Sequence, residues 1–149
     1  MLVRDALRRS GVGIPAGSSI FDAAAVMEAS GVGALVVFDG SHLAGVVTDR
    51  DLVRRALARR LAGDARVDSV MTAPVATIEG SADLDDAYVA FRATGVRRLA
   101  VLDDAGRFSG MLSLDDLLLH LSSHLRDVTR PVAAEVRAPH HDSLLPVPG

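Results

Sequence analysis

An internal duplication limits the possible folds of this 149-residue chain more than any other feature of its sequence. A shift of 64 positions sets residues 20–37 on residues 84–101, where seven of the eighteen pairs are identical. After one inserted residue the shift becomes 65, and "GVVTDRDL" (45–52) then matches "GMLSLDDL" (110–117). A tandem duplication predicts two copies of one structural unit, each of which needs the other to bury its core.

Each copy predicts the order strand, helix, strand, strand, helix. The first helix begins at "SSIFD", where a serine can cap it, and ends at Gly31. Asp39-Gly40 is typical of a hairpin between the two strands that follow. The fold class is therefore α/β (α+β). The apolar residues of the closing helix recur at helical spacing and are Leu52, Val53, Ala56, Leu57 and Leu61.

Three segments follow from this pattern. Residues 1–64 form the first repeat and residues 65–127 the second, joined through "LAGDAR" (61–66). Residues 128–149 contain four prolines and no sustained apolar period, which predicts a flexible tail that is dispensable for folding.

The composition excludes several classes of function. The net charge of −3 argues against a nucleic-acid partner, and no apolar run is long enough for a membrane helix. The N-terminus lacks the apolar core of a signal peptide, so we expect a cytoplasmic protein. Cysteine and lysine are absent and all 16 basic residues are arginine, as in a GC-rich bacterial genome. With so few catalytic groups, we expect that the chain is not an enzyme.

The duplicated corner allows two interpretations. Thr48-x-x-Asp51 and Ser113-x-x-Asp116 both fit a capping box, in which the hydroxyl and the acid satisfy backbone N–H groups. The same corner also delivers a helix N-terminus that favours an anion, and a nearby carboxylate can accept hydrogen bonds from ribose hydroxyls.

The whole repeat resembles a tandem pair of CBS (cystathionine-β-synthase) domains, called a Bateman module. The matching stretches are "VDSVMTAPVATI", "GVGALVVFD", "GVRRLAVLD" and the two corners, over residues 1 to about 126. The resemblance implies two repeats about a pseudo-twofold axis, with clefts that commonly hold adenosine-containing ligands. It also implies a stand-alone member that regulates an unknown protein target.

The resemblance implies two sets of ligand-binding residues, one for each repeat. Their apolar members could equally be plain core. The first set is Ile14, Pro15, Ala16, Val32, Gly33, Ala34, Thr48, Arg50 and Asp51. The second, weaker set is Ile78, Val96, Arg97, Arg98, Ser113 and Asp116.

Two differences between the repeats predict unequal sites. Asp115 stands where the first repeat has Arg50, and Arg97-Arg98 stand where it has Gly33-Ala34. A phosphate should prefer the corner with the arginine, and a base should prefer the smaller residues, so we expect the Thr48 corner to bind better. The two arginines could screen the acids of the second corner, or could reach across the axis to the first site.

Two further patterns favour ordinary explanations. His120 and His124 have a spacing that can hold a metal, but the sequence gives them no third ligand, so we expect no metal site. The run "RRALARR" (54–60) is typical of a solvated helix face rather than a nucleic-acid contact.

Two functions remain open. The first is a sensor that binds a nucleotide (AMP, ADP, ATP, S-adenosylmethionine or an NAD-type ligand) as a regulatory ligand, with no required cofactor. The alternative is a ligand-free dimerisation or interaction module whose corners are only helix caps. In either case, the leucines of the last helix predict a homodimer, because they exceed what one repeat can bury.

Overall fold

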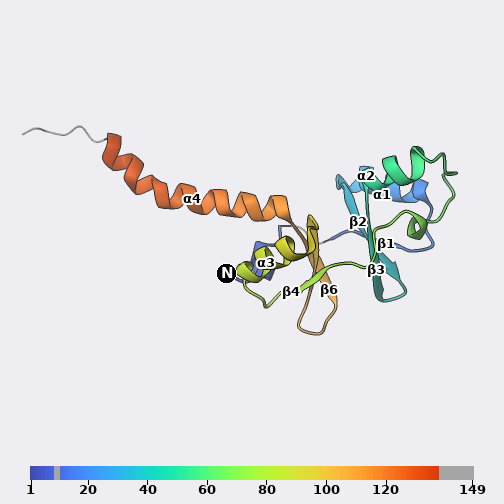
Figure 1. The fold of residues 1–149 in the computed structure, drawn as a ribbon, viewed down its shortest axis with the longest axis horizontal. Coiled ribbons are helices and arrows are strands. Elements are labelled where there is room, and N and C mark those ends of the chain that lie inside the picture. The colour runs from blue at the N-terminus through green and yellow to red at the C-terminus, as the bar shows by residue number, and fades with distance from the viewer. Residues whose placement is uncertain (9–10, 138–149) are drawn as a thin grey trace, which may run out of the picture.

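Two three-stranded sheets, one from each repeat, form the centre of the protein in a computed structural model that describes residues 1–8 and 11–137 (Figure 1). The first repeat contains β1 (Gly13–Pro15), α1 (Ile20–Ser30), β2 (Ala34–Asp39), β3 (His42–Thr48) and α2 (Asp49–Asp51), which continues as a π-helical turn, η2 (Leu52–Leu57). The second repeat contains β4 (Thr77–Glu79), α3 (Leu84–Thr94), β5 (Arg98–Leu102), β6 (Phe108–Ser113) and α4 (Leu114–Arg137). Short 3₁₀ turns precede the repeats, namely η1 (Val3–Ala6) and η3 (Val67–Ser69).

The order of elements predicted from the sequence is confirmed in both repeats. In each sheet the first strand pairs parallel with the second, and the second pairs antiparallel with the third. The Oγ of Ser19 accepts a hydrogen bond from the amide of Asp22 at 3.0 Å, as a helix cap requires. Gly31 and Gly95 end α1 and α3 with φ of 64° and 65°, a conformation that is strained for residues with a Cβ.

Each repeat is completed by a short segment that the sequence attaches to the other repeat. Val3 and Ala6 of η1 lie in the core of the second repeat, whereas Val67 and Val70 lie in the core of the first. Backbone hydrogen bonds hold both segments, from the Val3 amide to the Ala82 carbonyl (2.8 Å) and from Val67 to Ser18 (2.7 Å). The predicted boundary near residue 64 therefore separates the repeats in sequence but not in space.

The two sheets face each other across the pseudo-twofold axis. Val36 and Ala100 are fully buried, yet they belong to neither repeat's own core. The rings of Phe38 and Phe108 pack edge to face with centroids 5.8 Å apart, one ring from each repeat. Packing between the sheets thus turns two small units into one body.

The closing helices differ in length. α4 runs from Leu114 to Arg137 and projects beyond the body of the protein (Figure 1). Residues 128–137, which the sequence assigned to the flexible tail, continue α4 as helix, since alanine, glutamate and arginine favour helix despite Pro131. The remainder of the predicted tail, residues 138–149, lies outside the described residues.

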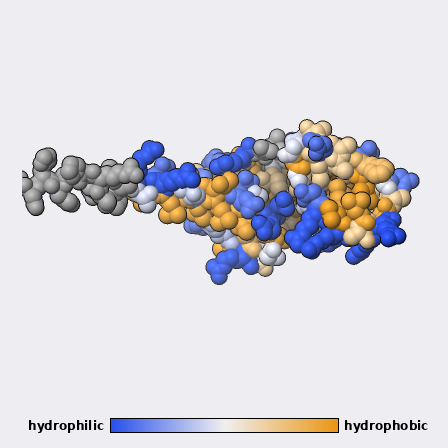
Figure 2. All heavy atoms as spheres, turned by 90° about the horizontal axis from the view of Figure 1, so that it is seen from above, coloured by the Kyte–Doolittle hydropathy of each residue, from blue (hydrophilic) through white to orange (hydrophobic). Residues whose placement is uncertain are grey.

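Apolar side chains stay exposed along the closing helices. Figure 2 shows such side chains gathered along α4. Leu57 is 71% exposed and Leu125 is 64% exposed, which is unusual for leucine in a protein of this size. The other exposed apolar residues of η2, of the segment after it and of α4 are Val53, Leu61, Leu118, Leu119, Leu121 and Val128.

Candidate functional site

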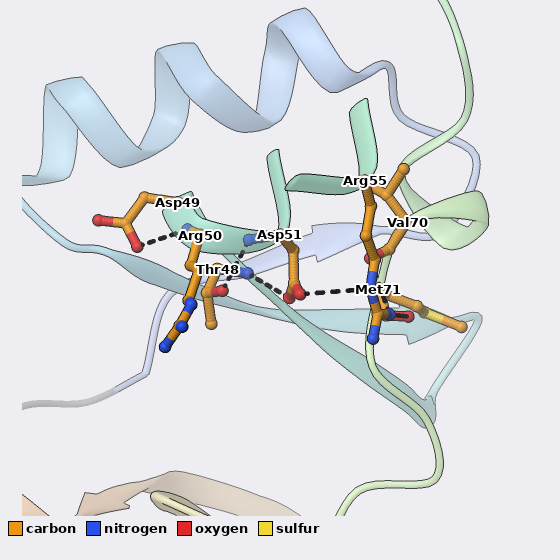
Figure 3. A network of polar contacts seen from close by, with 7 residues as sticks. All are labelled: Thr48, Asp49, Arg50, Asp51, Arg55, Val70 and Met71. Atoms are coloured by element: carbon orange, nitrogen blue, oxygen red, sulfur yellow. Dashed lines mark hydrogen bonds and ion pairs between the residues drawn. The ribbon is translucent and has the colours of Figure 1, made fainter. Parts of the chain in front are cut away.

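The first corner is a complete capping box. Thr48 ends β3, and its Oγ1 accepts a hydrogen bond from the Asp51 amide at 3.1 Å. In return, Oδ2 of Asp51 accepts from the Thr48 amide at 3.0 Å (Figure 3). The capping interpretation of this corner is confirmed. The Asp51 side chain is only 13% exposed.

Arg55 ties this corner to the segment that joins the two repeats. Its Nε lies 3.7 Å from Oδ1 of Asp51, and its Nη1 donates to the carbonyl of Met71 at 3.0 Å. Both oxygens of the Asp51 carboxylate therefore have partners within the protein. Figure 3 shows the Arg50 side chain extending away from Asp51, on the side of Thr48. Arg55 was not predicted from the sequence as part of the site, although its position one turn after Asp51 is a common ion-pair spacing.

The second corner has the same cap but lacks the arginine. Oδ2 of Asp116 accepts hydrogen bonds from the Ser113 hydroxyl at 2.6 Å and from the Ser113 amide at 3.4 Å. The Asp116 amide donates to the Ser113 hydroxyl at 3.0 Å. His120 stands at the repeat position of Arg55, and within the described residues Oδ1 of Asp116 has no ion-pair or hydrogen-bond partner.

Several cavities are lined by both repeats; of the two that lie at the corners, the larger opens at this second corner. Its volume is about 440 Å³, within the range that holds small-molecule ligands. Both repeats line it, so neither repeat forms the cavity alone. The lining residues are Arg8, Gly11, Val12, Gly31, Val32, Gly33, Ala34, Val36, Arg98, Met111, Ser113, Asp116 and Leu119. We call it the Asp116 cavity.

A smaller cavity opens at the first corner and is related to the larger one by the repeat. Its volume is about 210 Å³, below the usual range for ligand pockets. The lining residues are Val46, Thr48, Thr72, Pro74, Val75, Ala76, Val96, Arg97 and Arg98. We call it the Thr48 cavity.

The structure groups the predicted site residues differently from the sequence analysis. Residues 32–34 were expected beside Thr48, but they line the Asp116 cavity. Val96 and Arg97 were expected beside Ser113, but they line the Thr48 cavity, whereas Arg98 lines both cavities and so does accompany Ser113. The reason is the tight hairpin within each repeat. The Asp49 amide donates to the Gly33 carbonyl at 3.0 Å, which leaves no space for a ligand between them. Space opens only across the axis.

The predicted residues of the leading strands lie outside both cavities. Ile14 and Ala16 are 4% and 8% exposed and pack in the first core, and Ile78 packs against the second. Ile14 and the exposed Pro15 line a separate cavity of about 490 Å³ away from the corners. For Ile14, Ala16 and Ile78 the core alternative is the better description of their packing.

The chain instead uses residues just before these strands. Val12 and Ala76 line the two cavities at positions 64 apart, so the repeat offset could have identified them as a pair. Arg8 and Gly11 accompany Val12, and Thr72, Pro74 and Val75 accompany Ala76. Arg50 and Asp51 do not line the Thr48 cavity, although Asp116 lines its counterpart.

Arginine is the dominant charge at both cavities. Arg8 and Arg98 line the Asp116 cavity, and Arg97 and Arg98 line the Thr48 cavity. Nη2 of Arg97 lies 3.3 Å from Oδ1 of Asp115, so one arginine does screen the acids of the second corner as expected. This pair is exposed, and Asp115 does not line the Asp116 cavity. Both cavities are suited to an anionic ligand.

The two histidines of α4 lie close together. Their Nε2 atoms are 3.0 Å apart on the exposed side of the helix. Within the described part of the chain, no group of three or more histidine, cysteine, aspartate or glutamate side chains is placed to hold a metal ion. In the same residues, no helix has the length and apolarity needed to cross a membrane.

The repeats and the cavities between them can now be compared with known proteins. The family model described as "CBS domain" matches the chain twice, over residues 3–58 and 67–123. The chain belongs to the CBS domain family. The resemblance seen in the sequence is thereby confirmed, and the chain is a CBS pair.

Relatives share both the sequence and the fold of this CBS pair. The CBS domain-containing protein YhcV of Bacillus subtilis is 28% identical over 122 residues, which are 82% of this chain and 86% of YhcV. The CBS-domain containing protein ATU1752 from Agrobacterium tumefaciens is 28% identical, with a TM-score of 0.69 over 80% of this chain and 98% of its own. For the first three curated relatives, the chain spans 69%, 48% and 86% of the relative's length.

One similar structure carries a nucleotide. The CBS domain protein PAE2072 from Pyrobaculum aerophilum, described as complexed with AMP, is 26% identical to this chain. Its TM-score is 0.70, over 83% of this chain and 99% of its own.

Proposed function

We propose that this CBS pair is a regulatory module that binds an adenosine nucleotide between its repeats, with the Asp116 cavity as the principal site. The observation that carries this proposal is the composition of that cavity. A helix N-terminus with a hydroxyl and a carboxylate, the small residues Gly33 and Ala34, and two arginines converge on about 440 Å³. The relative crystallised with AMP supports the same class of ligand.

Each part of a nucleotide has a counterpart in the cavity. The start of α4 and the arginines favour phosphate, since both supply positive charge and N–H donors. Oδ1 of Asp116 can accept from ribose hydroxyls while Oδ2 keeps the helix cap. Val12, Val32 and the Gly33 backbone offer an apolar surface for a base. No step of this role requires bond-breaking, and we propose regulation rather than catalysis.

Thermal melts provide the test. We expect one of AMP, ADP, ATP, S-adenosylmethionine or NAD(H) to raise the melting temperature, because a ligand at one hundred times its Kd adds about 2.7 kcal/mol to stability. Adenosine alone serves as the control for the phosphate contacts and should have a smaller effect. If none of these ligands shifts the melt at millimolar concentration, the proposed function is wrong.

A second function, a dimerisation module, is favoured by the exposed apolar residues on η2 and α4. Leu118 and Leu119 are each 53% exposed, and exposure of apolar side chains to water is unfavourable unless another surface covers them. We propose a homodimer through this face. Leu119 also lines the Asp116 cavity, so the nucleotide site adjoins the proposed interface. Light scattering at tens of micromolar should give the mass of two chains. A monomer under these conditions would contradict the dimer but not the nucleotide site.

A further inference from the structure

Arg98 lines both the Asp116 cavity and the Thr48 cavity, and it is the residue that the two cavities share. It begins β5 and pairs in register with Ser113, the hydroxyl of the second corner. Its side chain is half-buried between the repeats. An arginine at this place can serve a ligand on either side of the pseudo-twofold axis.

The repeat provides only one such arginine. Ala34 occupies the equivalent position in the first repeat, 64 residues earlier, and pairs in register with Thr48. Its methyl group leaves the Asp116 cavity open toward the axis, so the guanidinium of Arg98 can extend into it.

The neighbouring arginines cannot take over this role. Arg97 lines the Thr48 cavity alone and is paired with Asp115 at 3.3 Å. Arg8 lines the Asp116 cavity alone. Each cavity is therefore lined by one arginine that the other cavity lacks, and Arg98 lines both.

We propose that Arg98 couples the two cavities, so that a phosphate-bearing ligand in one lowers the affinity of the other. This inference rests on the proposed function. A guanidinium binds phosphate through a planar fork, and one fork cannot be aimed at two phosphates on opposite sides of an axis. The second ligand then binds without this charge-assisted contact and near the phosphate of the first. We expect its affinity to fall by about tenfold or more.

The test separates coupling from simple inequality of the sites. Val12→Trp fills the Asp116 cavity and Ala76→Trp fills the Thr48 cavity, at equivalent positions of the repeat. Calorimetry with AMP on the two full-length variants gives each site's association constant alone. In the unaltered chain, we expect the product of the two stepwise constants to be about tenfold or more below the product of these separate constants.

Arg98→Ala should remove the shortfall of the stepwise product relative to the product of the separate constants. The matched variant Arg97→Ala should keep this shortfall. The coupling would be overturned if, in the unaltered chain, the product of the stepwise constants equals or exceeds the product of the separate constants. It would also be overturned if a shortfall remains after Arg98→Ala. Neither result would affect the conclusion that nucleotide binds. Absence of AMP binding in every chain would overturn the proposed function as well.

A second measurement avoids the tryptophan variants if either fails to fold. In the otherwise unaltered chain, Arg98→Ala should bring the two stepwise constants closer together, because it removes the cause of the weakened second step. Arg97→Ala weakens only the Thr48 cavity and should move them further apart. If both substitutions change the separation between the two stepwise constants in the same direction, the coupling is overturned.

Discussion

Asp51 and Asp116 are equivalent in the repeat, but their carboxylates have different surroundings. Arg55 and the Thr48 amide occupy the two oxygens of Asp51. Asp116 uses Oδ2 for the cap and lines the larger of the two corner cavities. The sequence favoured the Thr48 corner because of Arg50 and because Gly33 and Ala34 were placed beside it. In the structure Arg50 lines neither corner cavity, and Gly33 and Ala34 line the Asp116 cavity.

Substitutions of the two carboxylates should therefore have different effects on nucleotide binding. Asp116→Asn keeps a cap acceptor but removes the charge, and we expect it to weaken nucleotide binding by about 1.5–3 kcal/mol if the ribose contacts are charge-assisted. Asp51→Asn is the matched control and should change binding much less, because Asp51 does not line a cavity. Calorimetry on both variants decides the point. Greater loss of affinity in Asp51→Asn would restore the Thr48 corner as the main site.

A hairpin carboxylate in the second repeat provides a pH-dependent prediction. Hydrogen bonds from the backbone N–H of Arg107, then from its side chain and from the Ala105 amide, hold the pKa of Asp103 below its usual value. Because the pKa is lower in the folded state, the stabilisation is present above the unfolded pKa of about 3.9 and is lost as pH falls through the folded value. Carbon-13 NMR should show Asp103 titrating below the unfolded-state pKa of about 3.9. A midpoint at or above that value would contradict this prediction.

At the scale of elements, α4 is the part of the chain that the sequence described least well. Its first turns belong to the repeat, since Leu117 is fully buried. The described side chains from Leu125 to Arg130 are all exposed, so this part of the helix extends from the body. Helical structure there does not imply a contribution to the core.

Truncation after Asp127 tests whether the exposed end of α4 contributes to the stability of the fold. We expect the melting temperature to change by less than about 5 °C, which corresponds to roughly 1 kcal/mol for a domain of this size. Far-ultraviolet circular dichroism should lose the helical signal of residues 128–137 at the same time. A larger drop in melting temperature would show that the end of α4 contributes to a packed interface, as in the proposed dimer.

At the scale of the whole molecule, the exchanged segments make the two repeats dependent on each other. Val3 and Val67 are equivalent positions, and each is fully buried in the core of the repeat that follows or precedes its own. Neither repeat has a complete core without the other's leading turn. We therefore expect the pair to unfold in one transition.

Val3→Ala and Val67→Ala test this dependence as a matched pair. Each removes buried methyl groups and should lower the free energy of unfolding by about 1–3 kcal/mol. Chemical denaturation followed by circular dichroism should show a single transition in both variants. Two separated transitions, or an unaffected midpoint in Val3→Ala, would contradict the exchange of segments.

The sequence alone determined the features that depend on neighbouring residues. The duplication, the order of elements, the Ser19 cap, the glycine stops and both capping boxes follow from side chains within one or two turns of one another. The family could be recognised for the same reason, because its motifs are local and recur at a fixed offset.

Only the tertiary structure decided which segments share a cavity. Periodicity identifies a strand or a helix but not its partner across the axis, so the sequence did not show that residues 32–34 line the Asp116 cavity. The exchange of η1 and η3 was equally invisible, since the one or two apolar residues of each short turn do not indicate which core they enter. These outcomes depend on packing two sheets face to face, a long-range interaction in which adjacency along the chain no longer predicts adjacency in space.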